Sequence, residues 1–143
     1  MEVTVNYLAV FLAALSSMVV GSIWYSQSVF GKMWAKLAKI KMDRKPAASE
    51  MVVLLGGTFI ASLVTAYVLA HVSFLSHSFF KNDSFLQDAL ATAFWLWLGL
   101  TAARIFVHDA FEGRPWKLTL LTVSHELVTL LVMGLIIGWF GIQ

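Results

Sequence analysis

The stretch Trp116–Phe140, "WKLTLLTVSHELVTLLVMGLIIGWF", decides the fold of this chain. A transmembrane helix needs about 20 predominantly apolar residues, and this run exceeds that length. Its apolar residues are continuous rather than alternating, so the run predicts a helix and not a barrel strand. Two ionisable residues, His125 and Glu126, lie in its interior. A carboxylate at bilayer depth costs about 2.5–3.5 kcal/mol on insertion scales, so the pair is a candidate functional site.

The composition of the whole chain also indicates a membrane protein. Of its 143 residues, 59% are hydrophobic and 13% are charged, with a mean hydropathy of +0.80. Soluble domains carry about 25% charged residues, so this chain has too little polar surface to cover itself in water. The absence of cysteine excludes disulfides, thiolate metal sites and cysteine nucleophiles.

Three more apolar runs precede this one, and we expect four helices at about 5–26, 50–73, 87–107 and 116–140. The predicted fold is an all-α integral membrane four-helix bundle of two helical hairpins, in a single transmembrane domain over residues 1–143. A basic loop, 27–49, joins the first two helices. The first run lacks the basic start of a cleaved signal peptide, so we expect it to remain as a span.

The distribution of positive charge predicts the orientation of the helices. Lys81, in the second loop, is the exception among the ten Lys and Arg residues, because the others lie in or beside the first and third loops. The positive-inside rule therefore places these two loops in the cytoplasm and both termini on the opposite side of the membrane.

The basic loop has a helical pattern of its own in "SVFGKMWAKLAKIKMDRK", residues 28–45. Its apolar residues recur at helical spacing and its first lysines fall largely on another face, which is typical of a short amphipathic helix in the headgroup region. Because the charges lie between two apolar runs, they indicate anionic lipid rather than nucleic acid as the partner. The alternative is a charge cluster that only sets orientation. The residues expected at lipid headgroups are Lys32, Trp34, Lys36, Lys39 and Lys41.

The segment Val5–Trp34, "VNYLAVFLAALSSMVVGSIWYSQSVFGKMW", resembles the opening of a family of small bacterial membrane proteins known as domain of unknown function 1761. Phe111–Leu118, "FEGRPWKL", and Met133–Gly138, "MGLIIG", are similar to that family too. The resemblance implies four helices in a bacterial inner membrane and implies no activity. It also implies aromatic or uncharged polar residues at 125 and 126, where this chain departs. The matching residues near the N-terminus are Asn6, Gly21, Trp24, Tyr25, Ser26, Phe30, Gly31 and Trp34.

A polar layer is expected around the His-Glu pair. At 1.5 Å per residue from Trp116, Glu126 lies about 15 Å deep, near the bilayer centre. Arg104 lies little more than a turn closer to the cytoplasm, and His108 follows one turn later on the same face. Hydroxyls of the other helices reach similar depth, among them Ser16, Ser17, Thr58, Ser62 and Thr101. The predicted intramembrane polar site comprises Glu126, His125, Arg104, His108, Ser17 and Thr101.

Two interpretations of this layer remain open. In one, Arg104 and Glu126 form a structural ion pair, with His125 hydrogen-bonded to a serine or threonine hydroxyl, and the layer fixes helix pairing. In the other, Glu126 titrates in a proton- or ion-accessible site that His125 or Arg104 tunes.

Other classes of site are disfavoured. A zinc cluster of His108, Asp109, His125 and Glu126 has suitable ligand types, but neighbouring helical residues point about 100° apart, so we expect no metal and no cofactor. His71 and His77 are expected in interfacial water. No nucleophile elbow, phosphate loop or zinc-protease motif occurs, so the chain is not expected to be an enzyme.

Small residues recur every four positions on three helices, which lets helix backbones approach closely in lipid. They serve packing within the chain or contact between chains. We expect a homo-oligomeric channel or transporter subunit, with an accessory or scaffold subunit of a larger membrane assembly as the alternative. The predicted packing or oligomer residues are Ala9, Ala13, Ser17, Gly21, Gly134 and Gly138, and a third stripe consists of Gly57, Ala61 and Thr65.

Overall fold

The computed structural model describes residues 3–40, 46–80 and 84–142, and within these ranges the protein is helical with no strand. The all-α prediction is therefore confirmed for the described residues. Helices α4, η1 and α5 follow one another without a break and form one long rod. The elements are α1 (Tyr7–Trp24), α2 (Gly31–Leu37), α3 (Ala48–Phe79), α4 (Phe85–Leu96), the π-helix η1 (Trp97–Ala102), α5 (Ala103–Phe111) and α6 (Trp116–Phe140).

Four of these stretches are long and apolar enough to cross a membrane, as the sequence predicts: α1, α3, the rod of α4, η1 and α5, and α6. Helix α6 begins and ends at the residues expected for it. Helix α3 extends beyond its expected range, 50–73, by two residues at its start and six at its end. At the start, the Glu50 carboxylate accepts a hydrogen bond from the Ala47 N–H. The rod begins at a reciprocal cap between Ser84 and Gln87, two residues before the expected start.

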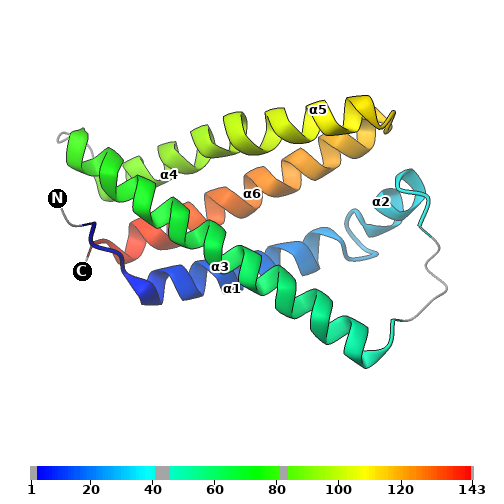
Figure 1. Ribbon diagram of the computed structural model, residues 1–143, viewed down its shortest axis with the longest axis horizontal. Coiled ribbons are helices and arrows are strands. Elements are labelled where there is room, and N and C mark those ends of the chain that lie inside the picture. Colours follow the sequence, from blue (N-terminus) through cyan, green and yellow to red (C-terminus); the bar gives the residue numbers. More distant parts are fainter. Residues whose placement is uncertain (1–2, 41–45, 81–83, 143) are drawn as a thin grey trace.

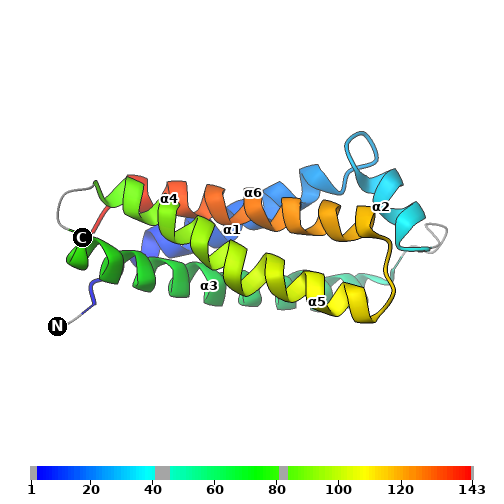
Figure 2. The same ribbon diagram turned by 90° about the horizontal axis from the view of Figure 1, so that it is seen from above.

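Figures 1 and 2 show the long helices running roughly along one axis, with both chain ends at one end of the molecule. Helix α1 packs against α6 and α3, and α4 packs against the same two helices. We call the end with the chain ends the terminal end, and the opposite end, with α2 and the α5–α6 turn (112–115), the basic end. This arrangement places the two halves of α6 in different surroundings.

The core of the molecule is built largely from small side chains. Lipid tails are as apolar as leucine, so membrane helices gain contact by close backbone approach over alanine, glycine and serine. The most buried residues follow this rule, since alanines make up half of the core cluster and larger apolar side chains fill the remaining space. The core includes Ala13, Ala14, Ala66, Ala70, Ala93, Leu69, Met133 and Ile137.

The first half of α3 leaves the other helices. Figure 1 shows α3 crossing α1 and diverging from the rod toward the basic end. Residues 48–58 are exposed on every face, and a Cβ added at Gly56 or Gly57 would meet no atom within 4 Å. Ala61 and Thr65 are exposed as well. The stripe of Gly57, Ala61 and Thr65 on α3 is therefore exposed and is not packed closely against another helix within the described chain.

The π-helix η1 lies in the middle of the rod and is tied to α6. The Trp97 indole Nε1–H donates a hydrogen bond of 2.8 Å to the Val123 carbonyl oxygen. A π turn takes in one more residue than an α turn, so it rotates every later residue of the rod relative to the earlier ones. Beyond Ala102, a residue therefore lies on a different face of the rod from the one that regular α-helical spacing would give it.

Candidate functional site

The candidate site is centred on the adjacent residues His125 and Glu126 of α6. Their side chains are joined by a hydrogen bond of 3.2 Å between His125 Nδ1 and Glu126 Oε1. The histidine side chain is 13% exposed, whereas the glutamate side chain is 35% exposed. The pair thus combines an enclosed imidazole with a carboxylate that retains open surface inside a membrane-length helix.

The imidazole of His125 is held by the end of α1. Its ring centroid lies 4.9 Å from that of Tyr25 and 5.9 Å from that of Trp24. A Cβ added at Gly21 would lie 3.6 Å from His125 Nε2, and the Thr129 hydroxyl oxygen lies 3.4 Å from the same nitrogen. Gly21 therefore lies beside the imidazole, where even a Cβ would make only an ordinary van der Waals contact.

These contacts also set the level of the pair along the helix axis. Trp24 is the last residue of α1, so His125 lies level with the basic end of α1 rather than midway along it. Tyr25, the residue after α1, is half-buried; this burial and, to a smaller extent, the Glu126 carboxylate raise the pKa of its phenol. The depth near the bilayer centre that the count from Trp116 gives stays a prediction.

The expected ion pair between Arg104 and Glu126 is absent among the described residues. Arg104 and His108 are both exposed on α5, and neither forms a hydrogen bond or ion pair with a described residue. The π-helix explains this difference, because it rotates α5 away from the face counted from the sequence. In the described part of the chain, Glu126 has a histidine for a partner and no Lys or Arg.

The other predicted polar residues do not join the pair. The hydroxyl oxygens of Ser17 and Ser62 lie 2.8 Å apart, linking α1 to α3, and Ser17 also bonds the Ala14 carbonyl. Thr101 is half-buried within η1. The hydroxyl beside His125 belongs instead to Thr129, one turn along its own helix.

A separate polar cluster closes the α5–α6 turn. The buried Asp109 carboxylate accepts a hydrogen bond of 2.7 Å from the Thr119 hydroxyl. Arg114 approaches two carboxylates, with its Nε 2.6 Å from Glu112 Oε2 and 3.7 Å from Asp109 Oδ1. The Arg114 N–H also donates to the Asp109 carbonyl oxygen at 2.9 Å. This cluster lies on α5, α6 and their turn and is distinct from the His-Glu pair.

A second histidine–carboxylate pair at the terminal end was missed by the sequence reasoning. His77 lies in the last turn of α3 rather than in a loop, and its Nδ1 is 2.7 Å from Asp88 Oδ2 in the first turn of α4. The Asp88 side chain is only 6% exposed and that of His77 is 31% exposed, so the expectation of interfacial water at His77 stays a prediction. The pair could have been predicted from a histidine and an aspartate that lie on either side of a short turn between two helices. His71 is half-buried, and its Nδ1 has no hydrogen-bond partner among the described residues.

Two of the small-residue stripes pack inside the described chain. A Cβ at Gly138 would lie 2.7 Å from Leu86 Cα, and one at Gly134 would lie 3.0 Å from the Ala89 carbonyl oxygen. These glycines allow α6 to approach α4 closely. On α1, the stripe faces inward too, with Ala9, Ala13 and Ser17 buried and Gly21 against His125.

The expected lipid-contacting segment forms the short helix α2, which leans on the rest of the protein. Gly31 and Ala35 are buried, and the Trp34 ring lies 5.3 Å from that of Tyr25. Lys32, Lys36 and Lys39 are exposed, as a headgroup contact would require, while Lys41 lies outside the described residues. Their contact with lipid remains a prediction. Among the described residues, no three His, Asp or Glu side chains converge as metal ligands.

Comparisons with known proteins place the chain in a family but give it no activity. No curated protein and no solved structure matches the chain. A family model described as "Protein of unknown function (DUF1761)" matches residues 8–138, nearly the whole sequence. The resemblance seen in the sequence is therefore confirmed, and the chain belongs to the DUF1761 family.

Proposed function

We propose that this protein is a subunit of a small homo-oligomeric channel or transporter in the bacterial inner membrane, with Glu126 as the titratable group on its path. One observation carries the proposal: the Glu126 side chain stays 35% exposed within an apolar helix and is paired with His125 rather than with a cation. A carboxylate in such surroundings lowers its cost by taking up a proton, a cation or water.

The hydrogen-bonded neighbour makes proton exchange chemically reasonable. The His125 imidazole can donate from Nδ1 to an ionised Glu126, or accept there from a protonated one, so a proton can be held on either side of the 3.2 Å contact. The Trp24 and Tyr25 rings and the Thr129 hydroxyl restrict the imidazole to one place. The chain acts by binding and exchange rather than by enzymatic catalysis.

The proposed setting is a membrane-spanning bundle of two helical hairpins with both termini periplasmic. Positive charge concentrated at the basic end supports a cytoplasmic location for α2 and the α5–α6 turn. The exposed stripe of Gly57, Ala61 and Thr65 on α3 supports contact with further copies of the chain.

Proton flux into liposomes tests the role of Glu126. The full chain is reconstituted with an enclosed pH dye, and a potassium diffusion potential drives protons inward. We expect flux with the native protein and a fall to the level of protein-free liposomes with Glu126→Gln, because the amide cannot titrate.

Glu50→Gln is the matched control for this substitution. Glu50 is exposed, and its carboxylate accepts a hydrogen bond from the Ala47 N–H. The side-chain oxygen of a glutamine can accept the same hydrogen bond. Its flux should equal that of the native protein. Native flux in a folded Glu126→Gln protein would remove Glu126 from the path.

A second candidate function follows from the first half of α3. Apolar side chains exposed on every face, together with Gly56 and Gly57, fit docking against helices of a larger membrane assembly, which would make this chain an accessory subunit. Native mass spectrometry of the protein extracted in mild detergent separates the two candidates. A defined homo-oligomer supports the channel, and stoichiometric copurification of other membrane proteins supports the accessory subunit.

A further inference from the structure

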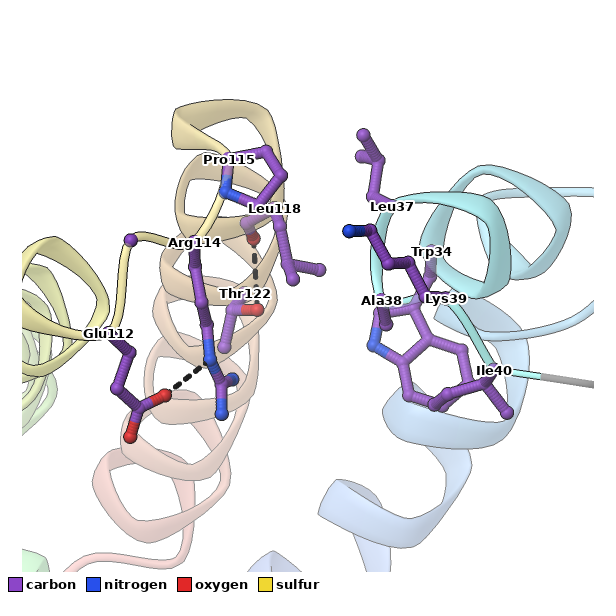
Figure 3. A pocket seen from close by; sticks show the side chains of 11 residues that line it. Trp34, Leu37, Ala38, Lys39, Ile40, Glu112, Arg114, Pro115, Leu118 and Thr122 are labelled. Carbon is purple, nitrogen blue, oxygen red and sulfur yellow. Dashed lines mark hydrogen bonds and ion pairs between the residues drawn. The ribbon is translucent and has the colours of Figure 1, made fainter.

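A pocket of about 430 Å³ opens at the basic end, between α2 and the turn that joins α5 to α6. We call it the Arg114 pocket. In Figure 3, Arg114 lies on the wall formed by the turn and α6, and Lys39 lies on the opposite wall at the end of α2. The ammonium group of Lys39 points across the opening, so positive charge approaches from both sides. The walls consist of residues 34, 37–40, 112–115, 118 and 122.

The Arg114 guanidinium is anchored through one nitrogen and keeps the others available. Its contacts with Glu112 and Asp109 both involve Nε, at 2.6 and 3.7 Å. No hydrogen bond to a described residue uses its two terminal nitrogens, which Figure 3 shows on the side away from Glu112. Paired terminal nitrogens are the donors with which arginine binds phosphate or carboxylate in a bidentate manner.

The backbone of Lys39 adds an independent observation. Its φ is +55°, and it is the one residue other than glycine with positive φ among the described residues. The position ends α2, since the Ile40 N–H donates to the Ala35 carbonyl oxygen at 3.0 Å, and helix ends of this kind favour glycine. A lysine there strains the backbone while directing its side chain over the pocket. Strained residues of this sort gather at binding sites.

The remaining walls match a lipid rather than a soluble ligand. Leu37, Leu118 and Trp34 supply apolar surface beneath the two cations, and Ile40 is exposed beside them. The pocket opens near the ends of membrane-length helices, where the proposed membrane setting would put phospholipid headgroups. Basic pockets between helices at this level bind anionic lipid headgroups.

We propose that the Arg114 pocket binds the phosphate of an anionic phospholipid, with Arg114 and Lys39 as its two cationic contacts and Trp34 against its glycerol and first methylenes. The site does not depend on Glu126 and selects two of the chain's many basic residues. Glu112 is part of the site, because it holds the guanidinium by its Nε and leaves the terminal nitrogens for the lipid.

Lipid retention in native mass spectrometry tests the site. The full chain is placed in nanodiscs of equal phosphatidylglycerol and phosphatidylethanolamine with the same acyl chains, then released in the spectrometer. We expect phosphatidylglycerol to be retained in preference. Arg114→Gln and Lys39→Gly should each lower that retention about fivefold, the effect of removing one cation near an anionic headgroup.

Two features of the design separate binding from folding. Lys39→Gly should keep or raise the thermal midpoint, because glycine adopts positive φ without strain, so its loss of lipid cannot come from unfolding. Lys117→Gln, which changes an exposed lysine of α6 outside the pocket, should retain lipid like the native protein.

Three results would overturn the proposal. These are equal retention of the two lipids by the native protein, an equal loss in Lys117→Gln, and complete displacement of the lipid by millimolar glycerol 1-phosphate. The last would identify a soluble phosphate ester as the ligand.

Discussion

The two halves of α6 differ in how they meet the rest of the protein. In the half toward the terminal end, Gly134 and Gly138 lie against α4 so closely that no Cβ fits beside Leu86. In the half toward the basic end, contact with the rod depends on polar groups: the Thr119–Asp109 bond and the Trp97–Val123 bond. The His125–Glu126 pair lies on this second half. Tight helix packing and the titratable His125–Glu126 pair therefore lie on different halves of one helix.

The largest expected effect comes from breaking the tight half. Gly138→Ala places a methyl group 2.7 Å from Leu86 Cα, so α4 and α6 must separate, and we expect a loss of about 3 kcal/mol in unfolding free energy. Unfolding by SDS in mixed micelles, followed by far-ultraviolet circular dichroism, measures this loss.

Gly57→Ala is the matched control on α3, where a Cβ meets no atom within 4 Å. Its stability should be unchanged or higher by up to about 1 kcal/mol, because alanine favours a helix over glycine. Equal losses in the two variants would contradict the close approach at Gly138.

A smaller effect is expected where hydrogen bonding replaces packing. Thr119→Val removes the donor from the buried Asp109 carboxylate while keeping the shape of the side chain, and we expect a loss of about 2 kcal/mol. Thr58→Val, which removes an exposed hydroxyl bonded to its own helix, should change stability by less than about 0.5 kcal/mol. The same SDS titration compares them, and indistinguishable values would show that the Asp109 bond contributes nothing.

The smallest effect is expected at the boundary between the halves. Trp97→Phe removes the indole N–H that bonds the Val123 carbonyl, with an expected loss of about 1 kcal/mol. Trp95→Phe alters an indole that is exposed on α4 and should leave the unfolding midpoint unchanged. A larger loss at Trp95 than at Trp97 would contradict the link between η1 and α6.

The sequence predicts the long helices well because each membrane span needs its own continuous run of apolar residues, and such a run can be seen without knowing the tertiary structure. The run ending at Phe140 is bounded by the residues expected, since Pro115 before Trp116 and Gly141 after Phe140 limit a helix on either side. Helix α2 was anticipated from its spacing too. The burial of Ala35 and the contact of α2 with α6 were not, because they depend on tertiary structure.

The candidate site was predicted only in part. His125 and Glu126 stand out as polar residues in an apolar run, but their partners depend on tertiary structure. The π-helix rotates α5 and Arg104 with it, and no local pattern reveals this π-helix or its bond from Trp97 to Val123. The His77–Asp88 pair escaped notice because its two residues belong to different helices. Local composition therefore identifies spans, whereas their rotation requires contacts between them.

The measurement that tests the account most directly is water access along α6. Because the chain lacks cysteine, Glu126→Cys and Leu130→Cys each create a single thiol, one helical turn apart on the same face. Glu126 is partly exposed in the open half, whereas Leu130 is buried in the core. Each variant is reconstituted in liposomes and treated with a small charged methanethiosulfonate. We expect rapid modification at position 126 and none at position 130. Equal modification at both positions, or none at 126, would contradict an open half of α6 around Glu126.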